Sequence, residues 1–361
     1  MDARAFGELV SAQGPFVSVH FDDSHRTEDA GKQLRLRVKD ITTALEEQKA
    51  DAETVDAVVR AIEDAPPPVG ESGRSLIAAG GEVLVDHRLA GPPPALEARH
   101  SALPYLVPLA SHEAQRPPHV VVVADAVGAD ITRYGRDGAH SETVTGQNHP
   151  VHTVRGGGTA HKDLQNRSEE TVKQNLEEVA GAVARAADHV GAEVVVLAGE
   201  VQARSALHEL LPESVRRITE TVEGASRAEP SGELDGQVAE LLLNRRATEL
   251  DDLAERFRAE TGRESGLAVS GLAGVTAALS EASVETLLVG DPGDAMVFTG
   301  PEPAQVGADG TRLDALGVPE PSRNRADEAL PYAAVATGAN IVAMDERLPL
   351  QDGFGALLRH S

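Results

Sequence analysis

The most unusual group of residues is a glycine-rich loop, predicted over residues 153–162 in the middle of the chain. Three consecutive glycines lose much backbone entropy on folding and add no side chain to packing. Such a run is typical of a segment that must bend or let another backbone approach closely. Within residues 151–168, three basic side chains stand against one acidic side chain, a local charge of +2 in a chain of formal net charge −25. A weakly basic arm for a phosphate-rich partner and a solvated surface loop both fit this pattern. The candidate binding residues are Arg155, Gly156, Gly157, Gly158, Thr159, His161 and Lys162.

The loop lacks the patterns of common nucleotide and metal sites. No Gly-Lys-Ser/Thr ending follows the glycines, and they are contiguous rather than spaced along a strand-to-helix turn, so neither a P-loop nor a dinucleotide fingerprint is present. His149, His152 and His161 are potential metal ligands, but no helical His-Glu-x-x-His frame accompanies them. No serine occupies a Gly-x-Ser-x-Gly elbow, and spacing singles out no pair of carboxylates. We therefore expect no metal, no cofactor and no catalytic residue.

A second basic cluster follows the turn at residues 22–25. Five basic residues stand against three acidic ones within residues 26–40, which again gives a local charge of +2. A site for phosphate contact near the start of a helix is one interpretation, and a solvated helix face is the other. The candidate binding residues are Asp23, Ser24, His25, Arg26, Lys32, Arg35 and Arg37.

Composition excludes several classes of protein. The 361 residues are enough for two or three domains, and the absence of cysteine excludes disulfides, cysteine-ligated metals and thiol nucleophiles. The N-terminus has no basic region before an apolar run, and no stretch approaches the ~18–20 apolar residues of a membrane span, so we expect a cytoplasmic protein. With 33 Lys and Arg against 58 Asp and Glu, the chain is unlike proteins that coat nucleic acid non-specifically. An RNA partner would be contacted at a few local basic points, and we expect neither a DNA nor a membrane partner.

The predicted elements form α/β domains separated by segments rich in proline or glycine. Prolines after residue 116 and the polar segment 223–236 mark two boundaries, which gives domains at residues 1–116, 117–232 and 233–361. The middle domain has the order strand, strand, loop, helix, strand, helix, strand, typical of an α/β fold. Helices are predicted over 28–63 (two helices, broken near 49–51), 163–190, from about 204, and over 237–261, 269–281 and 327–337. Strands are predicted over 16–23, 75–80, 82–89, twice within 119–138, and over 193–200, 216–222, 285–289, 295–298 and 340–344.

The C-terminal half carries a resemblance to a known family. Residues 253–291 resemble the start of the third domain of archaeal and eukaryotic class-one peptide chain release factors and of Pelota. There too a helix containing phenylalanine, a glycine turn and a second helix lead into a strand, here SVETLLV. Over nearly its full length the chain is similar to the bacterial branch of this superfamily, in the actinobacterial group of proteins like the ribosome hibernation factor Balon. The segments that carry this likeness are GPFVSVHFDDSH, ALPYLVPL, PVHTVRGG, RADEALPYAAVA and DGFGALLR.

The resemblance implies a fold and a function. The fold is a three-domain α/β (mixed α+β) architecture with an α/β N-terminal domain on the decoding-centre side of the ribosome. An RNase H-like middle domain extends its loop toward the peptidyl-transferase side, and a small α/β C-terminal domain binds a factor. The implied function is that of a hibernation factor, which fills the vacant ribosomal A site as a tRNA-shaped plug. Its partners would be 16S and 23S rRNA and elongation factor Tu.

The glycine loop departs from the release factors at the residue that serves their chemistry. Release factors carry Gly-Gly-Gln at this place, and the glutamine positions a water on the peptidyl-tRNA ester. Here the loop reads Gly156-Gly157-Gly158-Thr159, and the next glutamine is Gln165; the first domain also lacks the Asn-Ile-Lys-Ser stop-codon motif. We therefore expect a non-catalytic protein. The alternatives are a peptidyl-tRNA hydrolase for ribosome rescue, with Thr159 or His161 orienting water, and a stress protein with a non-ribosomal protein partner.

Overall fold

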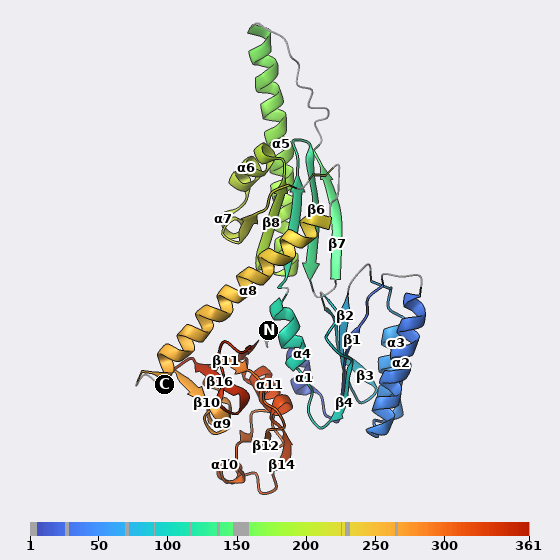
Figure 1. Cartoon of the computed structure of the whole chain (residues 1–361), viewed down its shortest axis with the longest axis vertical. Helices are drawn as coiled ribbons and strands as arrows, with labels where there is room; N and C mark the ends of the chain where they lie inside the picture. The colour runs from blue at the N-terminus through green and yellow to red at the C-terminus, as the bar shows by residue number, and fades with distance from the viewer. Residues whose placement is uncertain are drawn as a thin grey trace. The chain divides into compact units, whose positions relative to one another are not determined.

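The computed structural model describes residues 6–25, 29–68, 72–89, 91–115, 117–135, 138–146, 159–224, 226–227, 232–263 and 266–360; the side chains of 112–115 and 159–169 are not part of this description. The chain divides into two units (Figure 1): unit 1 combines Met1–Gln115 with Arg246–Ser361, and unit 2 is Arg116–Arg245. The predicted boundary after residue 116 lies beside the first change of unit. The predicted boundary after residue 232 lies at the start of helix α8 (Gly232–Thr261), which continues from unit 2 into unit 1.

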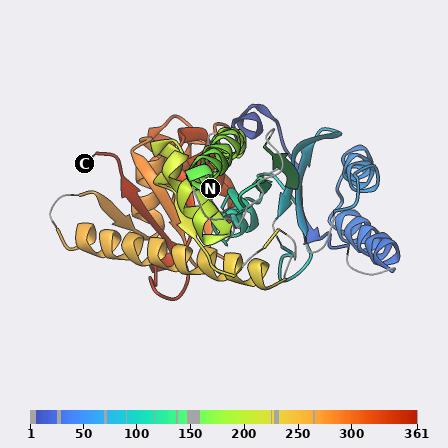
Figure 2. The ribbon, with the colours of Figure 1, turned by 90° about the horizontal axis from the view of Figure 1, so that it is seen from above.

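The N-terminal part of unit 1 is an antiparallel sheet with the strand order β3-β2-β1-β4. Residues of β1 alternate between its two faces, as the pleat of a strand requires. Val17, Val19 and Phe21 pack against the helices α2 and α3, whereas Phe16 belongs to the core on the opposite face. Figure 2 shows α2 and α3 (blue) along one side of this sheet. The elements are α1 (Gly7–Ser11), β1 (Phe16–Asp22), α2 (Ala30–Glu47), α3 (Ala52–Glu63), β2 (Gly73–Ala79), β3 (Glu82–Leu89), β4 (Glu97–Ser101) and α4 (Val107–Gln115).

The C-terminal part of unit 1 contains a sheet of order β10-β16-β11-β15 and a small sheet of order β13-β12-β14. Strands β11 and β15 run parallel, and the buried helix α11 lies between them in the chain. The elements are β10 (Ala268–Ser270), α9 (Gly271–Ser280), β11 (Val284–Val289), β12 (Met296–Thr299), β13 (Val306–Gly307), α10 (Gly310–Ala315), β14 (Ser322–Arg325), α11 (Ala326–Thr337), β15 (Asn340–Ala343), the 3-10 turn η2 (Gln351–Gly353) and β16 (Phe354–Leu358).

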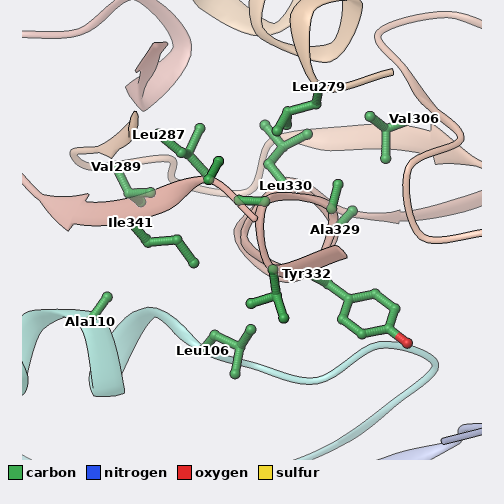
Figure 3. Close-up of a cluster of buried hydrophobic side chains, with 14 of the residues drawn as sticks. Leu106, Ala110, Leu279, Leu287, Val289, Val306, Ala329, Leu330, Tyr332 and Ile341 are labelled. Atoms are coloured by element: carbon green, nitrogen blue, oxygen red, sulfur yellow. The ribbon is translucent and has the colours of Figure 1, made fainter. Parts of the chain in front are cut away.

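One hydrophobic core joins the two parts of unit 1. Leu106 and Ala110 of the N-terminal part face α11 and the C-terminal strands (Figure 3), and they share a cluster of buried side chains with Leu330. The hydroxyl of Tyr332 donates a hydrogen bond to the carbonyl oxygen of Leu9 at 3.0 Å, which fastens α1 to α11. Neither part therefore buries its apolar surface without the other.

A buried ionic cluster lies beside this core. Arg99 on β4 reaches the start of α11, where its Nη1 is 3.1 Å from Oδ2 of Asp327 and 3.5 Å from Oε1 of Glu328. Arg325 holds the same Asp327 through Nε and Nη2, both at 2.9 Å. Asp327 and Glu328 are only 4% and 3% exposed, and this burial, together with the neighbouring Asp327 charge, raises the pKa of Glu328. Because buried carboxylates are tolerated only when they are paired, Arg99 ties the N-terminal sheet to α11.

Unit 2 is built on a five-stranded mixed sheet. Its order is β7-β6-β5-β8-β9, with β6 antiparallel to both neighbours and β5, β8 and β9 parallel. This order and these directions are those of an RNase H-like sheet, so the predicted fold of the middle segment is confirmed. Leu176 and Val183 of α5 cover one face, and Val238 and Leu242 of α8 cover the other. The elements are β5 (His119–Ala124), β6 (Gly128–Gly135), β7 (Gly138–Thr145), α5 (Thr159–Val190), β8 (Val194–Gly199), α6 (Val201–Leu210), α7 (Glu213–Arg216) and β9 (Thr219–Thr221).

The mixed α/β class is thus confirmed, and several boundaries differ from the prediction. Helices α5 and α8 begin four and five residues earlier than the predicted starts at 163 and 237. The predicted break near 49–51 is present, with Lys49 at φ 62° and Asp51 capping α3 through its bond from the Thr54 amide. The predicted helix over 269–281 is a short strand followed by α9. Strands β4, β7, β13, β14 and β16 were not predicted; β4, β7 and β14 are polar, and β13 has only two residues.

Candidate functional site

The structure describes part of the two predicted binding segments. In the glycine loop, Arg155, Gly156, Gly157 and Gly158 lie outside the described residues. Thr159, His161 and Lys162 form the first turn of α5, and their side chains are not described. In the N-terminal segment Arg26 lies outside the described residues, while Asp23, Ser24, His25, Lys32, Arg35 and Arg37 are described. The predicted roles of both segments stay predictions.

The turn after β1 is held by a network of hydrogen bonds. Asp22 accepts the backbone N–H of Ser24 at 2.9 Å through Oδ1 and the Arg37 guanidinium at 2.6 Å through Oδ2. The Ser24 hydroxyl donates to the Ser72 carbonyl at 3.2 Å, and the Ser72 amide donates back to Ser24 Oγ at 3.1 Å. The Asp23 amide also donates to the Ser72 carbonyl, at 2.9 Å. The turn is therefore tied to Ser72, just before β2, and to Arg37 of α2.

Asp23 differs from the other described candidates because it is buried. Its side chain is 4% exposed, and Nη1 of Arg88 lies 4.0 Å from its Oδ2. Burial raises the pKa of Asp23, while the charges of Arg74, Arg88, His25 and Arg37 oppose this rise. Arg74 is itself 3% exposed and forms two bonds, at 2.8 and 2.7 Å, to the carboxylate of Asp86. Arg74 and Arg88 were not among the residues predicted from the sequence; the available signal was an arginine on each of two adjoining strands, β2 and β3, that are otherwise rich in apolar residues.

Replacing Asp23 by asparagine should change how stability depends on pH. Between 3.8, the ordinary value, and the raised pKa of Asp23, the folded state binds more protons than the unfolded state. This group's contribution to stability is therefore present below pH 3.8 and is lost as the pH rises through the raised pKa. The free energy of unfolding of Asp23→Asn, measured with urea at a series of pH values, should accordingly rise relative to that of the wild type as the pH increases above 3.8 through the raised pKa.

Asp51→Asn is the matched control, because the pKa of Asp51 is shifted the other way. The amide of Thr54 donates to Asp51 and lowers its pKa, so its contribution is present above pH 3.8 and lost as the pH falls. Asp51→Asn should therefore lose stability relative to the wild type as the pH rises. Equal pH trends in the two variants would contradict the assignment for Asp23.

Helix α2 presents its basic residues on two sides. Arg37 is turned toward Asp22, and its side chain is 23% exposed. Lys32, Arg35 and Lys39 are exposed and lie three and four residues apart, so they form one row on the helix surface, here called the basic stripe. Nζ of Lys32 lies 2.7 Å from Oδ1 of Asp29, but both side chains are well solvated. This ion pair is therefore weak, and Lys32 can exchange it for a contact with a partner.

The basic stripe also surrounds an apolar side chain. Leu36 is 62% exposed in its midst, and it is one of several large apolar side chains of the described residues that are exposed. The positive charge of the stripe, rather than the leucine, suits a surface that is covered by a partner rich in phosphate.

Two further observations concern the described residues. Within the ranges given above, no group of three His, Asp or Glu side chains is placed to hold a metal ion. Of the helices in those ranges, none combines the length and the apolar character that crossing a membrane requires.

Comparison with known proteins identifies the family. Residues 118–263 match the model of Bacterial archaeo-eukaryotic release factor family 2. The chain is 41% identical over 356 residues to "Uncharacterized protein Rv2629" of Mycobacterium tuberculosis strain H37Rv, an alignment that covers 98% of this chain and 95% of that protein. The match to "Uncharacterized protein MT2704" of strain CDC 1551 has the same identity and coverage. The chain therefore belongs to this family, in the bacterial branch of the archaeal and eukaryotic release factor and Pelota superfamily.

Solved structures of the superfamily resemble the chain at low identity. An archaeal Pelota from a model of ribosome-bound Pelota and ABCE1 is 15% identical with a TM-score of 0.43, covering 99% of this chain and 94% of that chain. Dom34 of S. cerevisiae is 8% identical with a TM-score of 0.42, covering 80% and 81%. The archaeal translation termination factor aRF1 is 15% identical with a TM-score of 0.24, covering 99% and 98%. At these scores the overlays carry no argument, so the family assignment rests on the sequence matches.

Proposed function

We propose that this protein is a ribosome-binding factor without catalytic activity, which occupies the vacant A site as a tRNA-shaped plug together with elongation factor Tu. The observation that carries the proposal is the basic stripe on α2. It concentrates positive charge beside a rigid turn, on a chain whose formal net charge is −25. Family membership supplies the partner, because the superfamily consists of translation factors. The acidic remainder of the chain limits non-specific binding to RNA, which suits a protein that binds by shape.

The absence of catalysis is proposed from the glycine loop. Residues 156–159 read Gly-Gly-Gly-Thr, so the loop lacks the glutamine that release factors use to position water. What remains is a basic, glycine-rich segment leading into the 32-residue helix α5. We propose that it contacts rRNA and leaves the peptidyl-tRNA ester intact.

The test is co-sedimentation with vacant ribosomes over a series of salt concentrations. The double variant Arg35→Gln/Lys39→Gln should pellet less. The plot of log affinity against log salt concentration should also become flatter, its negative slope smaller in magnitude by about 1–2, because up to two phosphate contacts are lost. The control Lys49→Gln/Arg60→Gln removes the same charge from two exposed residues outside the stripe. It should pellet like the wild type. Equal slopes for all three proteins would remove the stripe from the interface, and failure of the wild type to pellet would favour a non-ribosomal partner.

A single-turnover assay on ribosome-bound peptidyl-tRNA separates the plug from the hydrolase. Release by the wild type should stay at background. Release well above background that disappears in Thr159→Ala and His161→Ala would overturn the non-catalytic assignment.

A further inference from the structure

A polar cleft of about 470 Å³ lies in unit 1 between strand β4 and strand β14. This volume is within the range of about 300–1,000 Å³ that is typical of ligand pockets. Three arginines line the cleft, Arg99, Arg323 and Arg325, against one carboxylate, that of the buried Glu328. Two of these arginines are paired with carboxylates, Arg99 with Asp327 and Glu328 and Arg325 with Asp327 and Asp294, so the unpaired positive charge of the cleft is that of Arg323.

The three arginines differ in how many donors they have left. Arg325 uses Nε, Nη1 and Nη2 on the carboxylates of Asp327 and Asp294 and on a backbone carbonyl. Arg99 is fixed by Asp327 and lies over the ring of Tyr105, 3.4 Å from its centroid. The side chain of Arg323 is exposed, and its guanidinium makes no hydrogen bond or ion pair with any residue that the structure describes. The cleft therefore combines two arginines of fixed geometry with one whole guanidinium fork available to a ligand.

His100 adds a polar atom that lacks a partner. Its Nδ1 lies 3.0 Å from the carbonyl oxygen of Gln48, which can only accept, so Nδ1 carries a proton. Its Nε2 is buried and has no hydrogen-bond partner. Buried polar atoms are nearly always paired, and this one is an unused bonding position in a side chain that lines the cleft.

We propose that this cleft binds a phosphate group. Arg323 is its anchor, while Arg99 and Arg325, held in place by their own carboxylates, and His100 form the wall around it. A planar guanidinium fork matches two phosphate oxygens, which explains an anchor of arginine rather than lysine. The phosphate can belong to a free nucleotide or to an RNA strand, because both present the same oxygens. The site goes beyond the proposed ribosome binding and does not depend on it, since the isolated chain is enough to test it.

The experiment is isothermal titration calorimetry on the full chain in a phosphate-free buffer at low salt. The probes are inorganic phosphate, adenosine monophosphate and a five-nucleotide oligoadenylate. Arg323→Gln should weaken binding about tenfold or more, because a charge-assisted pair of hydrogen bonds is lost, and Arg323→Lys should fall between this variant and the wild type. The control Arg60→Gln removes one exposed arginine of α3 and should bind like the wild type.

The outcomes separate the sources of phosphate. Binding of phosphate and adenosine monophosphate in a one-to-one ratio assigns the cleft to a free ligand, and binding of the oligonucleotide alone assigns it to an RNA strand. In either case the NMR signals of the His100 ring should shift when the probe is added. The proposal is overturned if no probe binds the wild type at millimolar concentration, or if Arg323→Gln and Arg60→Gln bind equally well.

Discussion

Replacing Leu330 by alanine is expected to lower the free energy of unfolding of unit 1 by about 2–5 kcal/mol. Leu330 is fully buried in the core that contains both Leu106 and Ala110 of the N-terminal part and the strands of the C-terminal part. Truncation removes the transfer free energy of the side chain and leaves a cavity that its neighbours fill only in part. Because the core is shared, the loss should appear in β1 and β2 as well as in β11 and β15. Urea unfolding gives its size, and hydrogen exchange by mass spectrometry gives its location.

Leu207→Ala is the control for this prediction. Leu207 is fully buried in the core of unit 2, so its truncation should cost a similar amount but raise exchange only in unit 2. If Leu330→Ala left β1 and β2 as well protected as in the wild type, the two parts of unit 1 would not form one cooperative structure.

Replacing Arg99 by alanine is expected to cost about 2–3 kcal/mol near pH 7. Breaking a buried ion pair by removing one partner costs about 3–5 kcal/mol. The lower value is expected because Arg325 still pairs with Asp327 and because the Arg99 side chain is 27% exposed. The cost should shrink as the pH falls toward the raised pKa of Glu328, since a protonated Glu328 no longer needs the guanidinium. Urea unfolding at several pH values measures this trend.

Two variants make this prediction specific. Arg256 pairs with Glu285 at 2.7 Å, but their side chains are 49% and 38% exposed, so Arg256→Ala should cost less than about 1 kcal/mol. In the double variant Arg99→Ala/Glu328→Gln the buried charge is absent, so part of the lost stability should return. A cost for Arg99→Ala that is the same at every pH would show that its packing on Tyr105, rather than its charge, is what matters.

The parts of the fold that could be predicted from sequence are those with a local periodic signal. Strand β1 was predicted because Val17, Val19 and Phe21 alternate with residues of the other face, and α11 because apolar residues continue past Pro331. Strand β4, with the sequence EARHS, has no apolar alternation and could not be found in this way. It is an edge strand whose outer side is covered by Gln48, which accepts from the His100 amide at 2.8 Å and donates to the Ala98 carbonyl at 2.9 Å.

Candidate sites formed by residues close together in the chain could likewise be predicted, and sites formed by residues far apart in the chain could not. The basic stripe could be predicted, because Lys32, Arg35 and Lys39 lie within two turns of one helix. The surroundings of Asp23 could not, because the charges of Arg74 and Arg88 that act on it belong to β2 and β3, far from Asp23 in the chain. The cleft between β4 and β14 combines Arg99 with Arg323, which lie more than 200 positions apart in the chain. No local sequence pattern predicts that two such residues lie close together. Contacts of this kind arise from the packing of the two parts of unit 1.

The bond between Tyr332 and Leu9 has a consequence for the synthesis of the protein. The two residues are 323 positions apart, and the core beside them needs side chains from both ends of the chain. Translation proceeds from the N-terminus, and domains generally fold as units while the chain emerges. The N-terminal sheet must therefore wait, with one apolar face uncovered, until the last helices have been made, whereas unit 2 has all its residues earlier and can fold first. In nascent chains of this protein, the N-terminal sheet, which is synthesised first, should therefore be the part that chaperones mainly bind.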